Sequence, residues 1–162
     1  LKNRKDQPRR TTIHLYRGPA PAIKIVVPKG YRGPLVIENQ PTKKLIQARK
    51  GQREFQFRAN SRGYVRVEAT PLLLRNAWTF DRSFVEAETG KVIESQPSDD
   101  QIGARYVTSF GKVTIWAIGD QADEQKVNRR AYRPVENDGN WSHITTDVEG
   151  IQKLLQEMRQ GE

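Results

Sequence analysis

The chain has 162 residues, which is enough to bury one hydrophobic core and most often means one domain. Its apolar content of 35% and mean hydropathy of −0.80 are low for a globular protein, and no apolar run approaches the roughly 20 residues that cross a bilayer. The formal net charge is +9, and the absence of cysteine excludes disulfides, a thiolate nucleophile and a cysteine-based zinc site.

The positive charge is concentrated in the N-terminal half. Residues 1–66 contain 17 Lys/Arg and 3 Asp/Glu, whereas residues 67–162 contain 11 and 16. Such asymmetry is typical of a nucleic-acid or membrane-surface face, although solvated cations on the strands of a sandwich produce the same counts. Residues 1–10 hold five cations without apolar periodicity, which predicts a basic flexible arm, either a nucleic-acid tail or a linker to a membrane anchor. Because the chain begins with Leu1, we expect that a signal peptide or anchor has been removed.

Alternating apolar and polar residues predict short β-strands from residue 11 onward. In residues 53–58 the alternation places Phe55 and Phe57 on a core face, and Trp116 is expected to be buried in a later strand. Turns rich in glycine and proline separate the strands at intervals of roughly 8–12 residues, a spacing typical of a sandwich or barrel. The expected strands are residues 11–16, 23–27, 35–38, 53–58, 64–69, 84–88, 92–95, 106–110 and 113–118.

The apolar period changes at the C-terminus. Apolar residues recur on one helical face between Val148 and Met158, and Thr146 with Glu149 matches a capping box. Gly150 weakens an isolated helix by about 1 kcal/mol relative to alanine, so we expect residues 147–160 to pack on the strands. The predicted fold is therefore all-β: a prealbumin- or immunoglobulin-like β-sandwich over residues 11–146, with one C-terminal α-helix. A partner-binding role for the helix is the alternative.

Residues 28–34 form a glycine- and proline-rich turn between two apolar strands. Gly30 and Gly33 permit positive φ, Pro34 starts the next strand, and Tyr31 can cover the end of a core. The glycine spacing does not match a dinucleotide-binding loop, which favours a structural role over ligand capture.

The segment from Pro28 to Glu38, with the strand before it, resembles the opening of a bacterial domain family of unknown function, whose members are mostly secreted or lipid-anchored. The segments at residues 61–65 and 115–119 are similar to later parts of that family, whereas residues 72–75 and the C-terminal helix depart from its pattern. The resemblance implies an extracytoplasmic all-β domain, periplasmic, secreted or lipid-anchored, with no activity attached.

No residue pattern predicts catalysis, a metal site or a cofactor. His14 and His143 lie far apart in the sequence without triad spacing. Glu86 and Glu88 could form a carboxylate pair on one strand face, as in a glycosidase, but two acids on a solvated strand face explain the same pattern more simply. The oxygen-rich stretches at residues 120–128 and 136–139 could supply calcium ligands, yet neither follows an EF-hand loop.

Basic and aromatic residues mark a tentative binding surface. Arginines alternate with aromatics over residues 49–66, as in single-strand nucleic-acid platforms, but the alternation also fits core aromatics beneath solvated cations. Trp78 and Trp141, outside clear strands, could meet a carbohydrate or peptide. The tentative surface is Arg49, Lys50, Arg53, Arg58, Arg62, Arg66 and Trp78.

These patterns favour a non-enzymatic extracytoplasmic binding or structural module. Its partner would be a protein, a peptide or a cell-envelope ligand, and the membrane would be reached only through a removed anchor. A nucleic-acid-binding domain and a hydrolase with an unrecognised acidic site are the alternatives.

Overall fold

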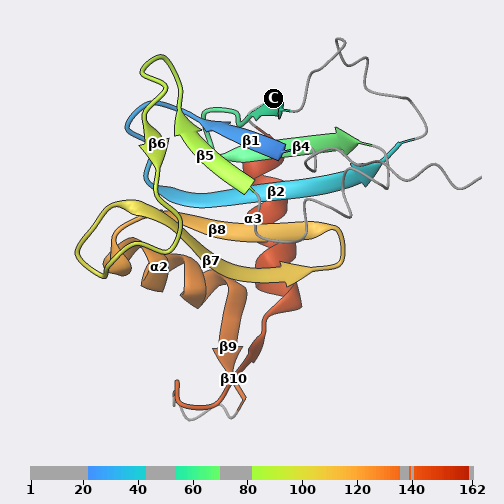
Figure 1. Ribbon diagram of the computed structural model, residues 1–162. Helices are drawn as coiled ribbons and strands as arrows, with labels where there is room; N and C mark the ends of the chain where they lie inside the picture. Colours follow the sequence, from blue (N-terminus) through green and yellow to red (C-terminus); the bar gives the residue numbers. More distant parts are fainter. Residues whose placement is uncertain (1–21, 43–53, 70–81, 136–138, 140, 161–162) are drawn as a thin grey trace, which may run out of the picture.

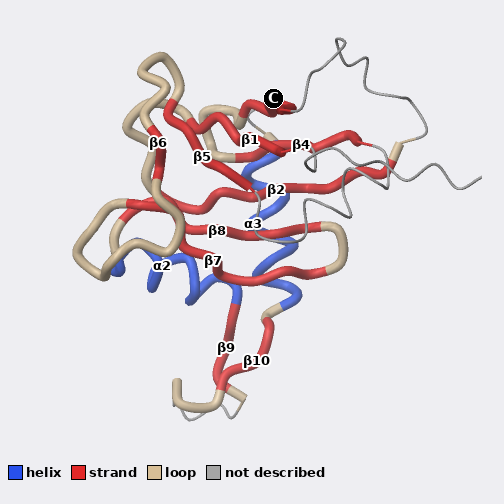
Figure 2. The backbone as a smooth tube through the Cα atoms, viewed as in Figure 1, coloured by secondary structure: helices blue, strands red, loops and turns tan. Residues whose placement is uncertain are grey.

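The protein, a computed structural model, is built mainly from β-strands in two open four-stranded mixed sheets, with two helices and a short two-stranded ribbon (Figures 1 and 2). The structure describes residues 22–42, 54–69, 82–135, 139 and 141–160. The predicted arm at residues 1–10 and strand at 11–16 lie outside this part. The strands are β1 (Ala22–Val27), β2 (Gly33–Pro41), β3 (Glu54–Arg58), β4 (Tyr64–Ala69), β5 (Arg82–Glu86), β6 (Val92–Ile93), β7 (Gly103–Phe110), β8 (Val113–Gly119), β9 (Tyr132–Pro134) and β10 (Ile144–Thr146), and the helices are α2 (Gln121–Ala131) and α3 (Val148–Arg159).

The chain alternates between the two large sheets over its first four strands. One sheet has the order β3-β1-β5-β6 and the other β4-β2-β8-β7. The turn after β1 carries the chain from the first sheet to the second, and the turn after β3 does the same. Within the sheets, β1 runs parallel to β3 and β2 runs parallel to β4. The antiparallel partners β5–β6 and β7–β8 are the hairpins. The sheets are therefore mixed.

Each large sheet contributes one face to a shared core. Ile23, Ile25 and Phe84 from one sheet lie in the same buried cluster as Leu35 and Ile37 from the other. Phe55 and Phe57 pack against this cluster as predicted, because alternate residues of β3 point to the same face. The β2-containing sheet has a second apolar face, covered by the two helices.

Helix α3 closes this second face and crosses the strands of the sheet behind it (Figure 1). Its buried residues Ile151, Leu154 and Met158 share a cluster with Val127 of α2. Gly150 is required where the helices meet, because a Cβ there would collide with the carbonyl oxygen of Arg130. Tertiary packing thus offsets the low helix propensity of glycine, as expected.

Helix α2 is absent from the sequence-based prediction, so the expectation of a single helix is wrong. Its sequence is polar, with only Val127 and Ala131 buried, and this sparse apolar pattern conceals its period. The predicted capping box of α3 is also wrong: the N-cap is Asp147, whose side chain accepts from the Gly150 N–H at 3.0 Å. Val148 is 40% exposed and does not join the buried face.

Tyr31 joins the turn between β1 and β2 to the turn between β3 and β4. Its hydroxyl shares its single proton between the carbonyl oxygens of Pro34 (2.5 Å) and Arg62 (2.7 Å), and the Val36 N–H donates to the Gly63 carbonyl at 2.8 Å. Burial raises the pKa of Tyr31 to about 12. Residues 28–34 therefore form a structural corner, in agreement with the sequence-based interpretation.

Candidate binding surface

The predicted basic surface is only partly described. Arg49, Lys50, Arg53 and Trp78 lie outside the described residues, whereas Arg58, Arg62 and Arg66 are exposed on β3, β4 and the turn between them. The described residues carry 16 Lys/Arg and 14 Asp/Glu, so their net charge is +2 of the total +9. The folded part that the structure describes is therefore nearly neutral.

Arg62 has a structural contact that the sequence does not reveal. Its Nη1 donates to the Glu157 carbonyl at 2.8 Å, and Nδ2 of Asn60 donates to the Met158 carbonyl at 3.1 Å. Carbonyl groups in the last turn of a helix have no intrahelical donor, so the β3–β4 turn caps α3 from outside. Within the predicted surface, Arg62 thus anchors a helix.

A buried carboxylate fixes the same end of α3. Glu38 of β2 accepts from Tyr64 Oη at 2.5 Å and from Nη2 of Arg159 at 2.6 Å. Burial favours the neutral acid, but the hydrogen bonds from Arg159 and Tyr64 outweigh it and lower the pKa of Glu38. This carboxylate therefore links the end of α3 to β2 and β4.

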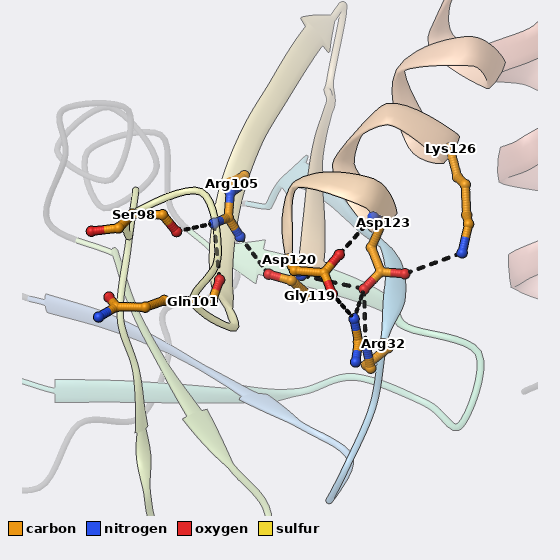
Figure 3. A network of polar contacts seen from close by, with 8 residues as sticks. All are labelled: Arg32, Ser98, Gln101, Arg105, Gly119, Asp120, Asp123 and Lys126. Atoms are coloured by element: carbon orange, nitrogen blue, oxygen red, sulfur yellow. Dashed lines mark hydrogen bonds and ion pairs between the residues drawn. The ribbon is translucent and has the colours of Figure 1, made fainter.

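The acidic residues at the start of α2 are neutralised by cations (Figure 3). Arg32, from the β1–β2 corner, pairs with Asp120 and Asp123, and Lys126 lies 3.5 Å from Asp123. Asp120 is the N-cap of α2; the Asp123 N–H, with Arg32, lowers the pKa of Asp120. The geometry assigns both carboxylates to capping and ion pairing.

Arg105 connects this helix start to the loop before β7. It is 3% exposed and donates to the carbonyls of Gly119, Ser98 (2.5 Å) and Gln101 (2.9 Å) (Figure 3). Its Nε also lies 3.5 Å from the carboxylate of Glu124. A buried guanidinium satisfied in this way organises backbone rather than binding a ligand. Within the described part, no group of three or more histidine or acidic side chains is placed to hold a metal ion.

Glu86 and Glu88 do not share a strand face. Glu86 accepts from the Gly30 N–H (2.8 Å) and from the Thr89 hydroxyl (2.6 Å), so it ties together the turns that follow β1 and β5. Glu88 lies in the second of these turns with φ of 66° and is 3.7 Å from Lys29. The strand ends before Glu88, which removes the shared face that the pairing required.

An aromatic row connects the sheets near β7. The Trp116 ring centroid lies 4.8 Å from that of Phe84 and 5.6 Å from that of Tyr106, and the indole is half-buried rather than buried as predicted. Arg82 donates to Asn39 across the sheets at 3.2 Å, and burial lowers its pKa to about 10. These contacts join the two sheets at one side of the shared core.

The β9–β10 ribbon carries the most distinctive exposed side chains. It extends away from both large sheets and from α2 (Figures 1 and 2), and at its base the Tyr132 hydroxyl donates to the Val107 carbonyl at 2.8 Å. Val135 is 61% exposed, and Trp141 and Ile144 are each 47% exposed. We call these three residues the ribbon patch. Of the predicted ligand-binding tryptophans, Trp141 is thus placed in an accessible position.

Most of the ribbon patch escapes prediction from the sequence. The three-residue strands are too short for a period-2 signal, and the residues between them have the composition of an oxygen-rich turn. His143, the described histidine, lies exposed in this ribbon, where its carbonyl accepts from the Val135 N–H at 2.8 Å. The usable signal is Trp141 itself, in a segment without strand pattern.

Comparisons with known proteins leave the family open. No protein-family model matches the chain, and no curated protein matches it. A solved structure of a candidate lipoprotein from Bacillus anthracis superposes with a TM-score of 0.38 at 13% identity, covering 88% of this chain and 96% of the other. That degree of similarity carries no argument about fold or function. In the described residues, neither helix is long and apolar enough to span a membrane.

Proposed function

We propose that this chain is a non-enzymatic binding module that presents the ribbon patch to a protein partner. The observation that carries the proposal is the exposure of Val135, Trp141 and Ile144 on a ribbon that extends from the body of the molecule (Figure 1). An exposed tryptophan and two exposed aliphatic side chains on one short ribbon support an interaction surface there. Tryptophan is enriched among the residues that contribute most to protein–protein affinity.

The rest of the described surface supports a scaffold role for the two sheets. Glu38, Asp120 and Asp123, the acidic groups of the two clusters, are engaged in ion pairs that hold helices in place. A general acid or nucleophile needs a group that can exchange protons with a substrate. No specific observation favours the hydrolase alternative.

The proposed location is outside the cytoplasm, either lipid-anchored or secreted. Its support is the resemblance of residues 28–38 to the secreted family. The core shared by the two sheets likewise supports the predicted sandwich arrangement. Fractionation of source cells tests the location, and recovery of the chain in the cytoplasm would contradict it.

Quantitative co-purification from source cells tests the partner. The full chain is compared with Trp141→Ala and with Phe110→Ala, an aromatic that is 41% exposed on β7. We expect at least one protein to be recovered with the wild type and with Phe110→Ala, and to be lost with Trp141→Ala. The thermal midpoints of all three should agree, because neither side chain is buried. Equal recovery with both variants would overturn the proposal.

A further inference from the structure

The turn between β1 and β2 and the turn between β3 and β4, here called the first and second corners, share a sequence feature. Each has an arginine followed by a glycine where its second strand begins, Arg32-Gly33 in the first corner and Arg62-Gly63 in the second. Gly33 has φ of 132° and Gly63 has φ of 82°, which places both in backbone conformations that favour glycine. The chain therefore builds one kind of corner twice.

The arginine of each corner holds one end of a different helix. Arg32 pairs with Asp120 and Asp123 at the start of α2, and its Nε donates to Asp123 Oδ2 at 2.7 Å (Figure 3). Arg62 donates to the Glu157 carbonyl in the last turn of α3 at 2.8 Å. Helix termini carry backbone groups without intrahelical partners, so each arginine acts where its helix is least held by its own hydrogen bonds.

Tyr31 connects the two corners by a close contact. It directly precedes Arg32 in the chain, and its shared hydroxyl proton reaches the carbonyl oxygen of Arg62 at 2.7 Å. Gly63 packs so closely against the Tyr31 ring that an added Cβ would collide with the hydroxyl. A shift of the second corner must therefore move the Tyr31 ring, and with it the backbone that carries Arg32.

We propose that the two corners form one clamp that couples the start of α2 to the end of α3. When the last turn of α3 separates from Arg62, the second corner gains freedom, Tyr31 loses its fixed position, and Arg32 holds the first turn of α2 less firmly. Release of α2 loosens α3 in the same way, because coupling between two sites is reciprocal. The two helices that cover the second apolar face of the β2-containing sheet then loosen together.

A second link between the helices reaches a different part of α2. Arg130, in the last turn of α2, pairs with the Glu157 carboxylate. This ion pair acts on the end of α2, whereas the clamp acts on its start. Backbone amides in the first turn of α2, compared with and without the Tyr31 hydroxyl, therefore distinguish the two routes.

Amide hydrogen exchange followed by NMR on the full chain tests the clamp. The N–H groups of Asp123 and Glu124 report on the first turn of α2, because they donate to the side chain and the carbonyl of Asp120. Ile115, buried in β8, reports on global unfolding. We expect Arg62→Ala to speed exchange at the two reporters by at least about twofold more than at Ile115, the lower end of coupling within one network.

The route is tested by removing the Tyr31 hydroxyl. In a Tyr31→Phe background, Arg62→Ala should no longer change exchange in the first turn of α2 relative to Ile115. Arg32→Ala is the reciprocal arm, which should speed exchange of the Met158 N–H in the last turn of α3 by a similar factor. Lys153→Ala is the matched control, because it removes an exposed α3 cation that pairs with Glu149 away from both corners, and it should change none of these ratios.

Four results would overturn the proposal. Unchanged exchange at the start of α2 in Arg62→Ala would mean that the corners act independently. An equal increase in the Tyr31→Phe background would assign the coupling to the pair between Arg130 and Glu157. An equal increase at Ile115 would reduce the effect to global unfolding. An equal increase in Lys153→Ala would show that any lost α3 cation has the same effect.

Discussion

Replacement of Gly63 by alanine should destabilise the protein more than the same change in another positive-φ turn. Gly63 has φ of 82°, and a Cβ at this position would collide with the Tyr31 hydroxyl and lie 2.5 Å from the Pro34 carbonyl oxygen. The clash displaces the Tyr31 ring, so its hydroxyl loses the contact with Pro34 inside its own corner and the contact with Arg62 in the other corner.

The magnitude follows from these two effects. A left-handed conformation costs an alanine about 1–2 kcal/mol, and the hydrogen bond that the Tyr31 hydroxyl shares between two carbonyl oxygens contributes about 1 kcal/mol. Gly63→Ala should therefore lower the free energy of unfolding by about 2–3 kcal/mol. Gly111→Ala is the matched control, because Gly111 has φ of 57° and an added Cβ would meet nothing within 4 Å beyond its chain neighbours. It should show the backbone cost alone, about 1–2 kcal/mol.

Urea unfolding followed by far-ultraviolet circular dichroism measures both variants. Tyr31→Phe provides the second arm, since it removes the hydrogen bonds and leaves the ring. In the double variant Gly63→Ala/Tyr31→Phe the two effects should overlap, giving less destabilisation than their sum. If Gly63→Ala and Gly111→Ala differ by less than about 0.5 kcal/mol, which is the scale of independent, additive effects, the corner does not depend on Tyr31 and the reasoning fails.

The remaining predictions concern charge, backbone strain and nucleic-acid binding. The pKa of Tyr31 is raised from 10.0 to about 12, so the unfolded chain loses this proton first as pH rises. The stability advantage of the wild type over Tyr31→Phe should therefore shrink between pH 10 and 12, and an unchanged difference in the free energy of unfolding would contradict this. The pKa of Glu38 is lowered, so its contribution to the free energy of unfolding is present at neutral pH and is lost as the pH falls below the pKa of the unfolded chain. Arg159→Ala should therefore lower the free energy of unfolding by about 2 kcal/mol at pH 7 and by progressively less in acid. The same loss at every pH in urea titrations would refute this. Glu88→Gly should raise the thermal midpoint by relieving φ of 66° at a cost of only a weak exposed ion pair, whereas a lower midpoint would show that the pair matters. For the nucleic-acid alternative, electrophoretic titration with single-stranded and duplex DNA should show no binding at about 50 mM salt, a condition at which phosphate contacts are strong; salt-steep binding would favour that alternative.

The strand pattern could be predicted where each strand has one buried face. Phe55 and Phe57 in β3, and Val65 and Val67 in β4, point to the shared core because alternation leaves them no other face. The hairpin turn at Gly90 is also confirmed, since its φ of 66° requires the residue that the sequence supplies. What these local signals could not predict is which strands pair, and the parallel partners β1–β3 and β2–β4 arise from corners that transfer the chain between sheets.

The missed elements lack the periodicity on which prediction depends. Helix α2 begins at Gln121, after the N-cap Asp120. From the sequence alone, Asp120 and its acidic neighbours resemble an oxygen-rich loop, because their partner Arg32 lies 88 residues away. The role of Arg62 also depends on a residue distant in sequence. From the sequence alone it is a surface cation, but in the structure it donates to the Glu157 carbonyl. The ribbon patch depends on two three-residue strands, and its exposure is a property of how the ribbon projects rather than of its composition.

The alternation of the chain between sheets has a consequence for how the molecule folds. Neither large sheet can assemble from consecutive strands, because β2 must already leave for the second sheet before β3 can join β1 in the first. The β5–β6 and β7–β8 hairpins can form locally, but completion of either sheet requires contacts between segments distant in sequence, which slows folding relative to a chain of local hairpins. The β9–β10 ribbon does not need such distant contacts to pair its strands, since β9 and β10 pair only with each other. Substitutions in the ribbon should therefore leave the slow step that builds the two large sheets unchanged.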